Sequence, residues 1–364
     1  MRDDLNVTLD SLMSVALREG VAPGAVLAVG RHGRIVHMKG YGRLDTAQAS
    51  PAVDENSIFD MASLTKVVAT TTAAMILEEQ GLLDLDRTVA SYLPEFNAPD
   101  KAPITVRMIS THRGGLEAFA ALYRDTKGRD QYLRQINSRP LKSNPGTQTV
   151  YSDWDMILLQ LVIEKITGTT LDQFLAGRVF GPLGMTSTMF NPDSTALFAR
   201  IAPTEIDSAR GGLVRGKVHD ENAWAMGGIS GHAGLFSTAP DLAVFAQMTL
   251  NGGEYSGVRI VKPATLARWT APQGRESSRA LGWDTPSGNS SAGRYFSPRS
   301  FGHTGFTGTS MWIDPERGLF VILLTNRVNP RRDNNRHIPL RRAVADAAQS
   351  AILDIPVTDW EATR

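Results

Sequence analysis

A serine and a lysine three positions apart, Ser63 and Lys66, lie in the stretch MASLTKVV and form the only Ser-x-x-Lys pattern of the chain. On a helix these two side chains share one face. The start of a helix also favours negative charge, through its unpaired N–H groups and its dipole. Apolar surroundings lower the pKa of a lysine by desolvation, and a neutral amine can take the proton of a serine hydroxyl and activate it as a nucleophile. The alternative is a surface lysine behind an N-cap serine, because the pattern arises by chance roughly once in a chain of this size.

Two further tripeptides strengthen the chemical interpretation of this pair. YSD at 151–153 precedes the most regular helical segment of the middle of the chain, and HTG at 303–305 lies in strand-like sequence before SMWID. Each tripeptide is expected by chance only roughly a few hundredths to a tenth of a time. Together with the serine and the lysine they supply a phenol, a carboxylate and an imidazole, which are groups that can move protons or hold a substrate.

The elements expected to position these residues follow from hydrophobic spacing. Leucines at helical spacing predict a helix over 4–19, and two strand-like runs around His32-Gly33 predict a hairpin. Residues 63–80 are apolar or small nearly all round and end at Gly81, which predicts a buried helix.

The rest of the chain places helices between two strand-rich ends. Its predicted elements are helices over 155–168, 241–250 and 340–353, strands over 310–314 and 318–326, and a flexible loop rich in Ser, Gly, Pro and Arg over 272–298. This order predicts a mixed sheet made from both chain ends, with a helical lobe inserted between them.

Composition excludes several classes of protein. The 364 residues are 42% hydrophobic and 21% charged with a net charge of +1, so no global field attracts nucleic acid or anionic lipid. The absence of cysteine excludes disulfides, thiolate catalysis and Cys-ligated metal. A basic run over 327–342 is interpreted as a solvated face. No apolar run is long enough to span a membrane. The start MRDDLNVTLD lacks an apolar leader core, so the chain as it stands is expected in the cytoplasm, or in the periplasm if a leader was removed.

The order Ser-x-x-Lys, Tyr-Ser-[Asn/Asp], [Lys/His]-Thr-Gly resembles that of the serine penicillin-recognising hydrolases, above all class C β-lactamases, DD-peptidases and family VIII esterases. The resemblance covers nearly the whole chain, including VAPGAVLAVGRHGRIVHMKGYG, NPGTQTVYSD and AGLFSTAPDLAVF. It implies a β-lactamase/transpeptidase-like α/β (α+β) fold, with an antiparallel sheet flanked by helices and an inserted all-helical domain. Residues 1–364 are then a single unit, in which 1–62 and 240–364 form the α/β sandwich and 63–239 the mainly helical domain. The active site is expected at their junction.

The resemblance also implies catalytic roles. Ser63 is the nucleophile, Lys66 holds its hydroxyl and shares its proton, and Tyr151 acts with Lys66 as the general base. A nearby ammonium favours the phenolate form of a tyrosine, which explains the pairing. The backbone N–H groups of Ser63 and Phe306 form the oxyanion hole, where such donors are worth roughly 3–4 kcal/mol.

Five residues are predicted to bind substrate: Asp153, His303, Thr304, Gly305 and His219. Two of them depart from the β-lactamase pattern. His303 replaces a lysine, and an imidazole with a reference pKa of about 6.5 is only partly cationic at neutral pH. Asp153 replaces an asparagine, and an ionised carboxylate cannot donate to a substrate carbonyl; it is expected to pair with Lys66 or with a substrate ammonium. Both departures favour an ester or peptide hydrolase over a specialised β-lactamase.

No cofactor and no metal are predicted. His219, Asp220, Glu221 and His232 could be considered as metal ligands, but their spacing matches no known metal motif, and a hydrogen-bonded loop explains them better.

The sequence therefore predicts a serine hydrolase that acts through an acyl-enzyme on Ser63. Its substrates are small esters, D-amino-acid peptides or β-lactams, as in a carboxylesterase or a DD-peptidase-like penicillin-binding protein. The alternatives are a true class C-type β-lactamase and, from another class, a non-catalytic scaffold or penicillin-binding sensor. The expected partner is a small-molecule or peptide substrate, with no nucleic acid and no integral membrane segment; the sequence leaves the oligomeric state open.

Overall fold

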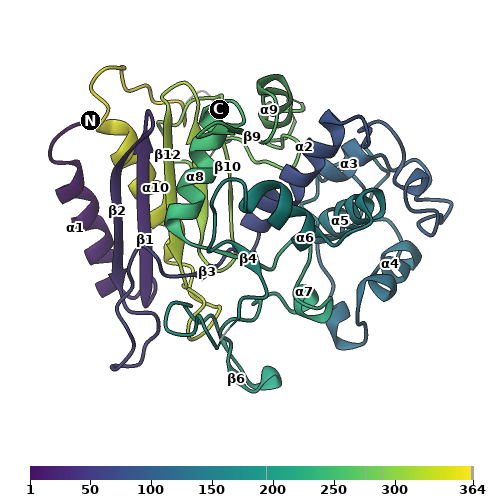
Figure 1. Cartoon of the computed structure of the whole chain (residues 1–364), viewed down its shortest axis with the longest axis horizontal. Coiled ribbons are helices and arrows are strands. Elements are labelled where there is room, and N and C mark those ends of the chain that lie inside the picture. The colour runs from purple at the N-terminus through teal and green to yellow at the C-terminus, as the bar shows by residue number, and fades with distance from the viewer. Residues whose placement is uncertain (194, 275, 289, 362–364) are drawn as a thin grey trace.

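Both ends of the chain contribute strands to one five-stranded antiparallel sheet (Figure 1). The computed structural model describes residues 1–193, 195–274, 276–288 and 290–361. The strand order is β10-β11-β12-β1-β2. The bounds are β1 Gly24–Arg31, β2 Arg34–Gly42, β10 Phe301–Thr304, β11 Ser310–Asp314 and β12 Leu319–Thr325. The hairpin predicted around His32-Gly33 is confirmed as β1 and β2.

Helices cover both faces of this sheet. Alternate residues of the central strands enter two separate cores: Leu27 and Val321 join the core with α1 (Leu5–Arg18) and α10 (His337–Ser350), whereas Val26 and Ile322 join the core with α8 (Ala239–Leu250). A strand that alternates between two apolar layers is buried on both sides. The predicted fold class, an antiparallel sheet flanked by helices with a helical lobe, is confirmed.

The helical lobe lies beside the sheet, next to β3 and β10 in Figure 1. Its longest helix, α5 (Asp153–Thr167), has ten consecutive buried residues and ends at Gly168, which has a left-handed φ of 68°. A glycine after the last turn ends a helix at little cost. The other helices of the lobe are η1 (Lys66–Thr71), α2 (Thr72–Glu79), η2 (Val89–Ser91), α3 (Val106–Ser110), η3 (Leu122–Arg124), α4 (Arg129–Ser138), α6 (Leu171–Leu175), η4 (Ala176–Phe180) and α7 (Glu221–Ala225).

A second, three-stranded sheet joins the lobe to the main sheet. It pairs β3 with β7 and β7 with β4, and the Met61 N–H donates to the Leu235 carbonyl at 2.9 Å just beyond it. This pairing brings the residues before Ser63 beside those after His232. The remaining elements are β3 (Phe59–Asp60), β4 (Met189–Phe190), β5 (Ile206–Asp207), η5 (Ser208–Arg210), β6 (Gly212–Leu213), β7 (Leu235–Ser237), β8 (Glu254–Tyr255), β9 (Val258–Arg259) and α9 (Pro263–Thr270).

Most of the predicted helices are confirmed, and one is displaced. The last helix was expected over 340–353 and runs over 337–350 instead. It begins before Pro339 because the first-turn N–H groups of a helix have no partner within it, so proline is tolerated there. The helix α9 belongs to residues 240–364, which were expected in the α/β sandwich, but it contacts α2 of the helical lobe. The domain boundaries therefore stay a prediction. No helix among the described residues is long and apolar enough to cross a membrane.

The end of β10 approaches the segment before Ser63 so closely that only glycine fits at position 305. A Cβ on Gly305 would lie 2.6 Å from the Met61 carbonyl oxygen and closer still to Thr309 Oγ1. Thr309 Oγ1 also donates to that Met61 carbonyl at 3.0 Å. The glycine of the HTG tripeptide therefore fixes the distance between the two halves of the site.

We expect Gly305→Ala to lower the free energy of unfolding by roughly 1–3 kcal/mol, because overpacking forces the backbone or its neighbours to shift. Urea unfolding followed by circular dichroism measures it. The matched control is Gly177→Ala, where nothing lies within 4 Å of the added Cβ and the change should be neutral or stabilising by less than about 1 kcal/mol. Equal stabilities of the two variants would contradict the close approach.

Candidate active site

The amine of Lys66 is the centre of the site. Its side chain is fully buried, and Nζ donates to Ser63 Oγ at 3.0 Å, to Asp153 Oδ1 at 2.8 Å and to the His232 carbonyl at 3.0 Å. Lys66 begins a π-helical segment, Lys66–Thr71, at the start of the buried helix. Such local widening of a helix is frequent at functional sites. All three donor positions of an ammonium are thus satisfied.

The charge of Lys66 differs from the expectation. Burial by itself lowers the pKa of this amine, as predicted, but Asp153 and Tyr151 outweigh it, so that the pKa of Lys66 is raised above its ordinary value. The expected neutral amine is therefore wrong for the resting site, because a carboxylate lies at hydrogen-bond distance. Lys66 is an ammonium that holds the Ser63 hydroxyl.

Tyr151 lies among cations and histidines. Its ring centroid is 4.8 Å from Lys66 Nζ, 5.0 Å from the Arg279 guanidinium carbon and 4.7 Å from the His112 ring. His112 is buried, which, with the nearby charges of Arg279 and Lys66, keeps its pKa well below the usual value, and its Nδ1 accepts from the Ser152 N–H at 3.2 Å. The neutral His112 thereby fixes the backbone of the YSD tripeptide.

Two backbone N–H groups are available for an oxyanion. Among the described residues, neither the Ser63 N–H nor the Phe306 N–H has a hydrogen-bond acceptor. Ala62, directly before Ser63, has a φ of 45°, which is strained for a residue with a Cβ. The Asp60 carboxylate holds this turn by accepting from the Ala62 N–H at 2.8 Å and from the His219 N–H at 2.6 Å. Strain kept in place by such bonds is frequent at catalytic turns.

Two arginines of the C-terminal basic run hold the other donor in place. Arg327 Nε donates to the Phe306 carbonyl at 2.7 Å, and Arg341 donates to the Gly305 and Thr309 carbonyls at 2.7 Å each. Burial, with the nearby Arg327, lowers the pKa of Arg341 to about 9.

The interpretation of the basic run as a solvated face is therefore wrong at these two positions. Arg327 and Arg341 are buried, at 2% and 7% exposure. Backbone carbonyls accept from Nε and Nη1 of Arg327 and from Nη2 of Arg341, which lets these guanidinium groups line a cleft instead of facing bulk water.

His303 is uncharged. Burial, together with Arg279 and Lys66, puts the pKa of His303 well below its ordinary value. The Arg279 guanidinium donates to His303 Nε2 at 3.4 Å, so Nδ1 carries the proton and donates to the Thr304 carbonyl at 2.8 Å. The partly cationic imidazole expected from the sequence is corrected to a neutral side chain, because the ring is buried and a cation lies beside it.

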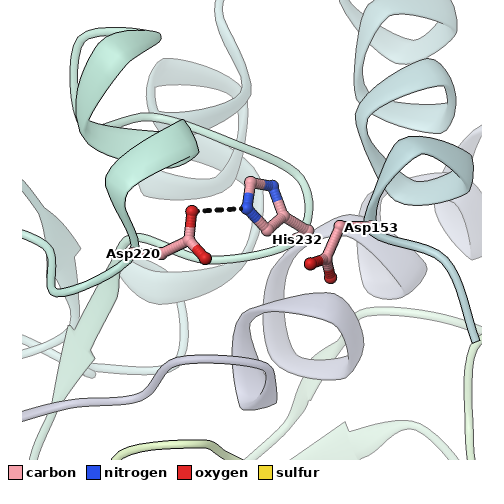
Figure 2. A group of neighbouring side chains, drawn as sticks. All are labelled: Asp153, Asp220 and His232. Carbon is pink, nitrogen blue, oxygen red and sulfur yellow. Dashed lines mark hydrogen bonds and ion pairs between the residues drawn. The ribbon is translucent and has the colours of Figure 1, made fainter. Parts of the chain in front are cut away.

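The opposite wall carries carboxylates and histidines. His232 Nε2 bonds to Asp220 Oδ1 at 2.8 Å, and His219 Nε2 bonds to Glu205 at 3.0 Å. Burial by itself raises the pKa of Asp220, but its interactions with His232 and the Ala223 N–H outweigh burial and lower that pKa below its ordinary value. Figure 2 shows Asp220 and His232 side by side, with Asp153 pointing toward them from the start of α5.

These three residues form the one group of metal-ligand type found among the described residues. Their ligand atoms lie within 4.8 Å of one another. However, the Lys66 ammonium already bonds to Asp153, and His232 already bonds to Asp220. A metal ion would have to displace an existing positive charge, so we keep the prediction that no metal takes part.

The turn at Ser63 and the two tripeptides meet around one cleft of about 790 Å³, which Ser63, Tyr151, Asp153, His219, His303, Thr304, Gly305 and Phe306 all line. The structure thus brings every residue predicted to line the site into one place, with Lys66 beneath the cleft. Arg279, Arg341, Asp220 and His232 also line it. In the sequence, Asp220 and His232 were considered only as metal ligands, and that role was rejected. Nothing in the sequence indicated that Arg279 belongs to the site, because it lies in a loop without a recognisable motif.

Comparison with known proteins identifies the family of this chain. The family model named Beta-lactamase matches residues 9–346, so the chain belongs to the β-lactamase family, and it is a serine hydrolase.

Two relatives and one solved structure show what this chain is similar to. The "Putative D-alanyl-D-alanine carboxypeptidase" of Escherichia coli (strain K12) is 34% identical over 343 residues, which cover 84% of this chain and 78% of the relative. The N-acetylmuramyl-L-alanine amidase of Bacillus subtilis (strain 168) is 35% identical over 340 residues, covering 84% and 77%. The structure of EstCE1, a hydrolase with promiscuous acyltransferase activity, superposes with a TM-score of 0.76 at 24% identity and covers 94% of this chain and 98% of its own; at that identity it shows the fold alone.

Replacing Asp153 with asparagine should lower the pKa of Lys66, because it removes the carboxylate that raises it. Any limb of the kcat/KM profile that reports Lys66 then moves to lower pH. A raised lysine pKa stabilises the fold at pH values below the unfolded pKa, and this stability is lost as the pH rises through the folded pKa. Asp153→Asn should therefore cost roughly 1.5–3 kcal/mol at neutral pH, the usual strength of a hydrogen bond to a charged group, and less near pH 11.

The measurements for this variant are a pH–rate profile and urea unfolding at the two pH values. The control is Asp3→Asn, an exposed carboxylate near the amino terminus, which should leave both unchanged. An Asp153→Asn enzyme with wild-type stability at neutral pH would show that the ion pair does not hold the site.

Chelation should have no effect. Because Lys66 occupies the position a metal ion would need, we expect EDTA, added zinc and added magnesium to leave the rate of ester hydrolysis unchanged. The rate of p-nitrophenyl butyrate hydrolysis before and after dialysis against EDTA tests this. A loss that zinc restores would assign Asp153, Asp220 and His232 to a metal site.

Proposed function

We propose that this enzyme hydrolyses amide bonds of cell-wall-type peptides through an acyl-enzyme on Ser63. The observation that carries the proposal is the contact of Lys66 Nζ with Ser63 Oγ at 3.0 Å, made by a buried ammonium that Asp153 holds in place. A hydroxyl held in this way beside a phenol and two free backbone donors suits acyl transfer.

The proposed reaction uses these groups in two halves, acylation and deacylation of Ser63. Ser63 Oγ attacks the carbonyl carbon while its proton passes to Tyr151, which reacts as the phenolate that the Lys66 ammonium favours, and Lys66 keeps the hydroxyl in place. The carbonyl oxygen becomes an oxyanion, which the N–H groups of Ser63 and Phe306 stabilise. Tyr151 then gives the proton to the leaving nitrogen, the C–N bond breaks, and an amine departs. Water attacks the ester on Ser63 in the second half, with Tyr151 as base, and releases the acid.

The relatives support an amide substrate. The Escherichia coli and Bacillus subtilis proteins, each about one third identical over 84% of this chain, are named for amide bonds to alanine, in a D-alanyl-D-alanine unit and in N-acetylmuramyl-L-alanine. Both names describe fragments of the bacterial cell wall. We therefore place the substrate among amides whose leaving group or acyl group is an alanine of that kind.

Turnover of penicillins is the weaker candidate. Asp153 accepts from Lys66 and has no N–H to offer to the side-chain amide of a penicillin, and His303 is neutral where a lysine would hold the carboxylate. A non-catalytic scaffold or sensor is less consistent still with the contact between Lys66 and Ser63, because a protein that catalyses no reaction does not need this contact.

Removing the nucleophile should abolish catalysis. Ser63→Ala should lose both the release of alanine from D-alanyl-D-alanine-terminated peptides or N-acetylmuramyl-L-alanine and covalent labelling by a fluorophosphonate, as read by intact mass. Lys66→Ala and Tyr151→Phe should each lose most of the rate, and the double variant little more, because groups that act as one unit are strongly non-additive.

The matched control is Ser11→Ala, an exposed serine of α1, which should keep wild-type labelling and rate. Labelling of Ser63→Ala at the wild-type rate would overturn the nucleophile assignment. An enzyme that is labelled at Ser63 but releases alanine from neither amide would refute the substrate class and leave the acyl-enzyme intact.

A further inference from the structure

Asp60 is a buried carboxylate that no lysine or arginine among the described residues neutralises. It is 2% exposed, and its two oxygens accept from backbone N–H groups, Oδ1 from Ala62 at 2.8 Å and Oδ2 from His219 at 2.6 Å. Burial raises the pKa of Asp60, and these two bonds oppose burial only in part. A buried charge without a counter-ion is costly, and groups perturbed in this way cluster at functional sites.

The carboxylate holds the turn that presents the first oxyanion donor. The N–H of Ser63 belongs to the peptide that follows Ala62, so the backbone angles of Ala62 decide where this N–H points. Ala62 has a φ of 45°, which a residue with a Cβ adopts only at a cost in free energy. The bond from the Ala62 N–H to Asp60 Oδ1 helps to offset that cost and keeps the turn in place.

The backbone carbonyl of Asp60 reaches the turn that presents the second donor. It accepts from Thr307 Oγ1 at 2.8 Å, and Thr307 is buried and directly follows Phe306. The next carbonyl along the chain, that of Met61, accepts from Thr309 Oγ1 at 3.0 Å. Two hydroxyls of the turn after β10 thus bond to two successive carbonyls, which sets the separation of the two oxyanion donors.

The second carboxylate oxygen ties this arrangement to a wall of the cleft. His219, whose N–H it accepts, lines the cleft, whereas Asp60 lies behind the lining. One residue therefore bonds to the nucleophile turn, to the turn after β10 and to the loop before α7. An amide in place of the carboxylate could satisfy only one of the two N–H groups, because its nitrogen is a donor.

We propose that Asp60 is a positioning residue of this enzyme, which sets the geometry of both oxyanion donors through its carboxylate on the Ser63 side and through its carbonyl on the Phe306 side. The residue acts on the rate through backbone groups and without contact to the reacting atoms. This inference rests on the proposed acyl-enzyme at Ser63.

The test compares two substrates, p-nitrophenyl butyrate and p-nitrophenyl thionobutyrate, which differ only in the carbonyl oxygen or sulfur. Sulfur accepts hydrogen bonds weakly, so the thionoester gains little from the two N–H groups of the hole. The ratio of kcat/KM for the oxo ester over the thionoester therefore reports the hole. A change in Ser63, Lys66 or Tyr151 affects both substrates and cancels in the ratio.

Asp60→Asn should lower this ratio. Losing an oxyanion donor altogether costs roughly 10²–10³-fold in rate, and a displaced donor keeps part of that effect, so we expect a fall of roughly tenfold. Thr307→Val, which keeps the size of the side chain and removes its hydroxyl, should lower the ratio by roughly two- to tenfold, the usual effect of one hydrogen bond. The thionoester rates should change little in both variants.

Each variant has a matched control. Asp54 also accepts from the N–H two residues ahead, that of Asn56, at 3.0 Å, but it is exposed and outside the cleft. Thr249 is a buried threonine of α8 whose hydroxyl donates to the Ala246 carbonyl at 2.7 Å, also away from the cleft. Asp54→Asn and Thr249→Val should leave the ratio unchanged.

The wild-type enzyme offers the same test without a substitution, which decides the matter if Asp60→Asn does not fold. A protonated carboxyl group turns one of its acceptors into a donor, so the ratio should fall as the pH falls through the pKa of Asp60. His219 and Asp220 are the titratable groups that act on Asp60, and Asp220 raises its pKa. Asp220→Asn should therefore move this fall to lower pH.

The outcomes separate this inference from the proposed function. Equal losses on the two substrates in Asp60→Asn, or a wild-type ratio that stays constant with pH while the enzyme is folded, would overturn the role of the carboxylate. An unchanged ratio in Thr307→Val would overturn the role of the carbonyl. Failure to cleave cell-wall amides would refute the proposed substrate class alone, because both test substrates are esters.

Discussion

A buried ammonium is the constraint on which the rest of this site depends. Lys66 is fully buried, and an unpaired charge in that position would cost several kcal/mol. The Asp153 carboxylate, the Ser63 hydroxyl and the His232 carbonyl are its three acceptors. These acceptors come from the nucleophile turn, the start of α5 and the loop before β7, so satisfying one amine fixes three distant segments around one point.

Charged side chains also line the cleft around this amine. Carboxylates lie on the side of Asp153 and Asp220, and guanidinium groups lie along the end of β10, where Arg279 and Arg341 flank the HTG strand. Burial together with the nearby Arg279 leaves His303 neutral, and Asp153 keeps Lys66 protonated.

Backbone contacts set the precision of the oxyanion region. Gly305 lets the end of β10 approach Met61, while Arg327 and Arg341 bond to carbonyls of the turn that carries Phe306. The donors of the hole are thus held by contacts within the protein before a substrate binds. Catalytic hydrogen bonds require such preorganisation, since donors that must reorganise during the reaction stabilise the oxyanion less.

The sequence by itself determined the periodic and local features: the sheet strands, the buried helix behind Ser63, the terminating Gly168, the pair of Ser63 and Lys66, and the two tripeptides of the site. These depend on side-chain spacing and on conformations available to single residues, which short stretches of sequence reveal. Only the tertiary structure decided the charges of Lys66 and His303, because a pKa depends on which distant groups come within a few ångströms. The same holds for Arg279 and for the buried arginines of the basic run. Their partners are backbone carbonyls, side chains and rings far away along the chain, and no local pattern of residues indicates a contact of that kind.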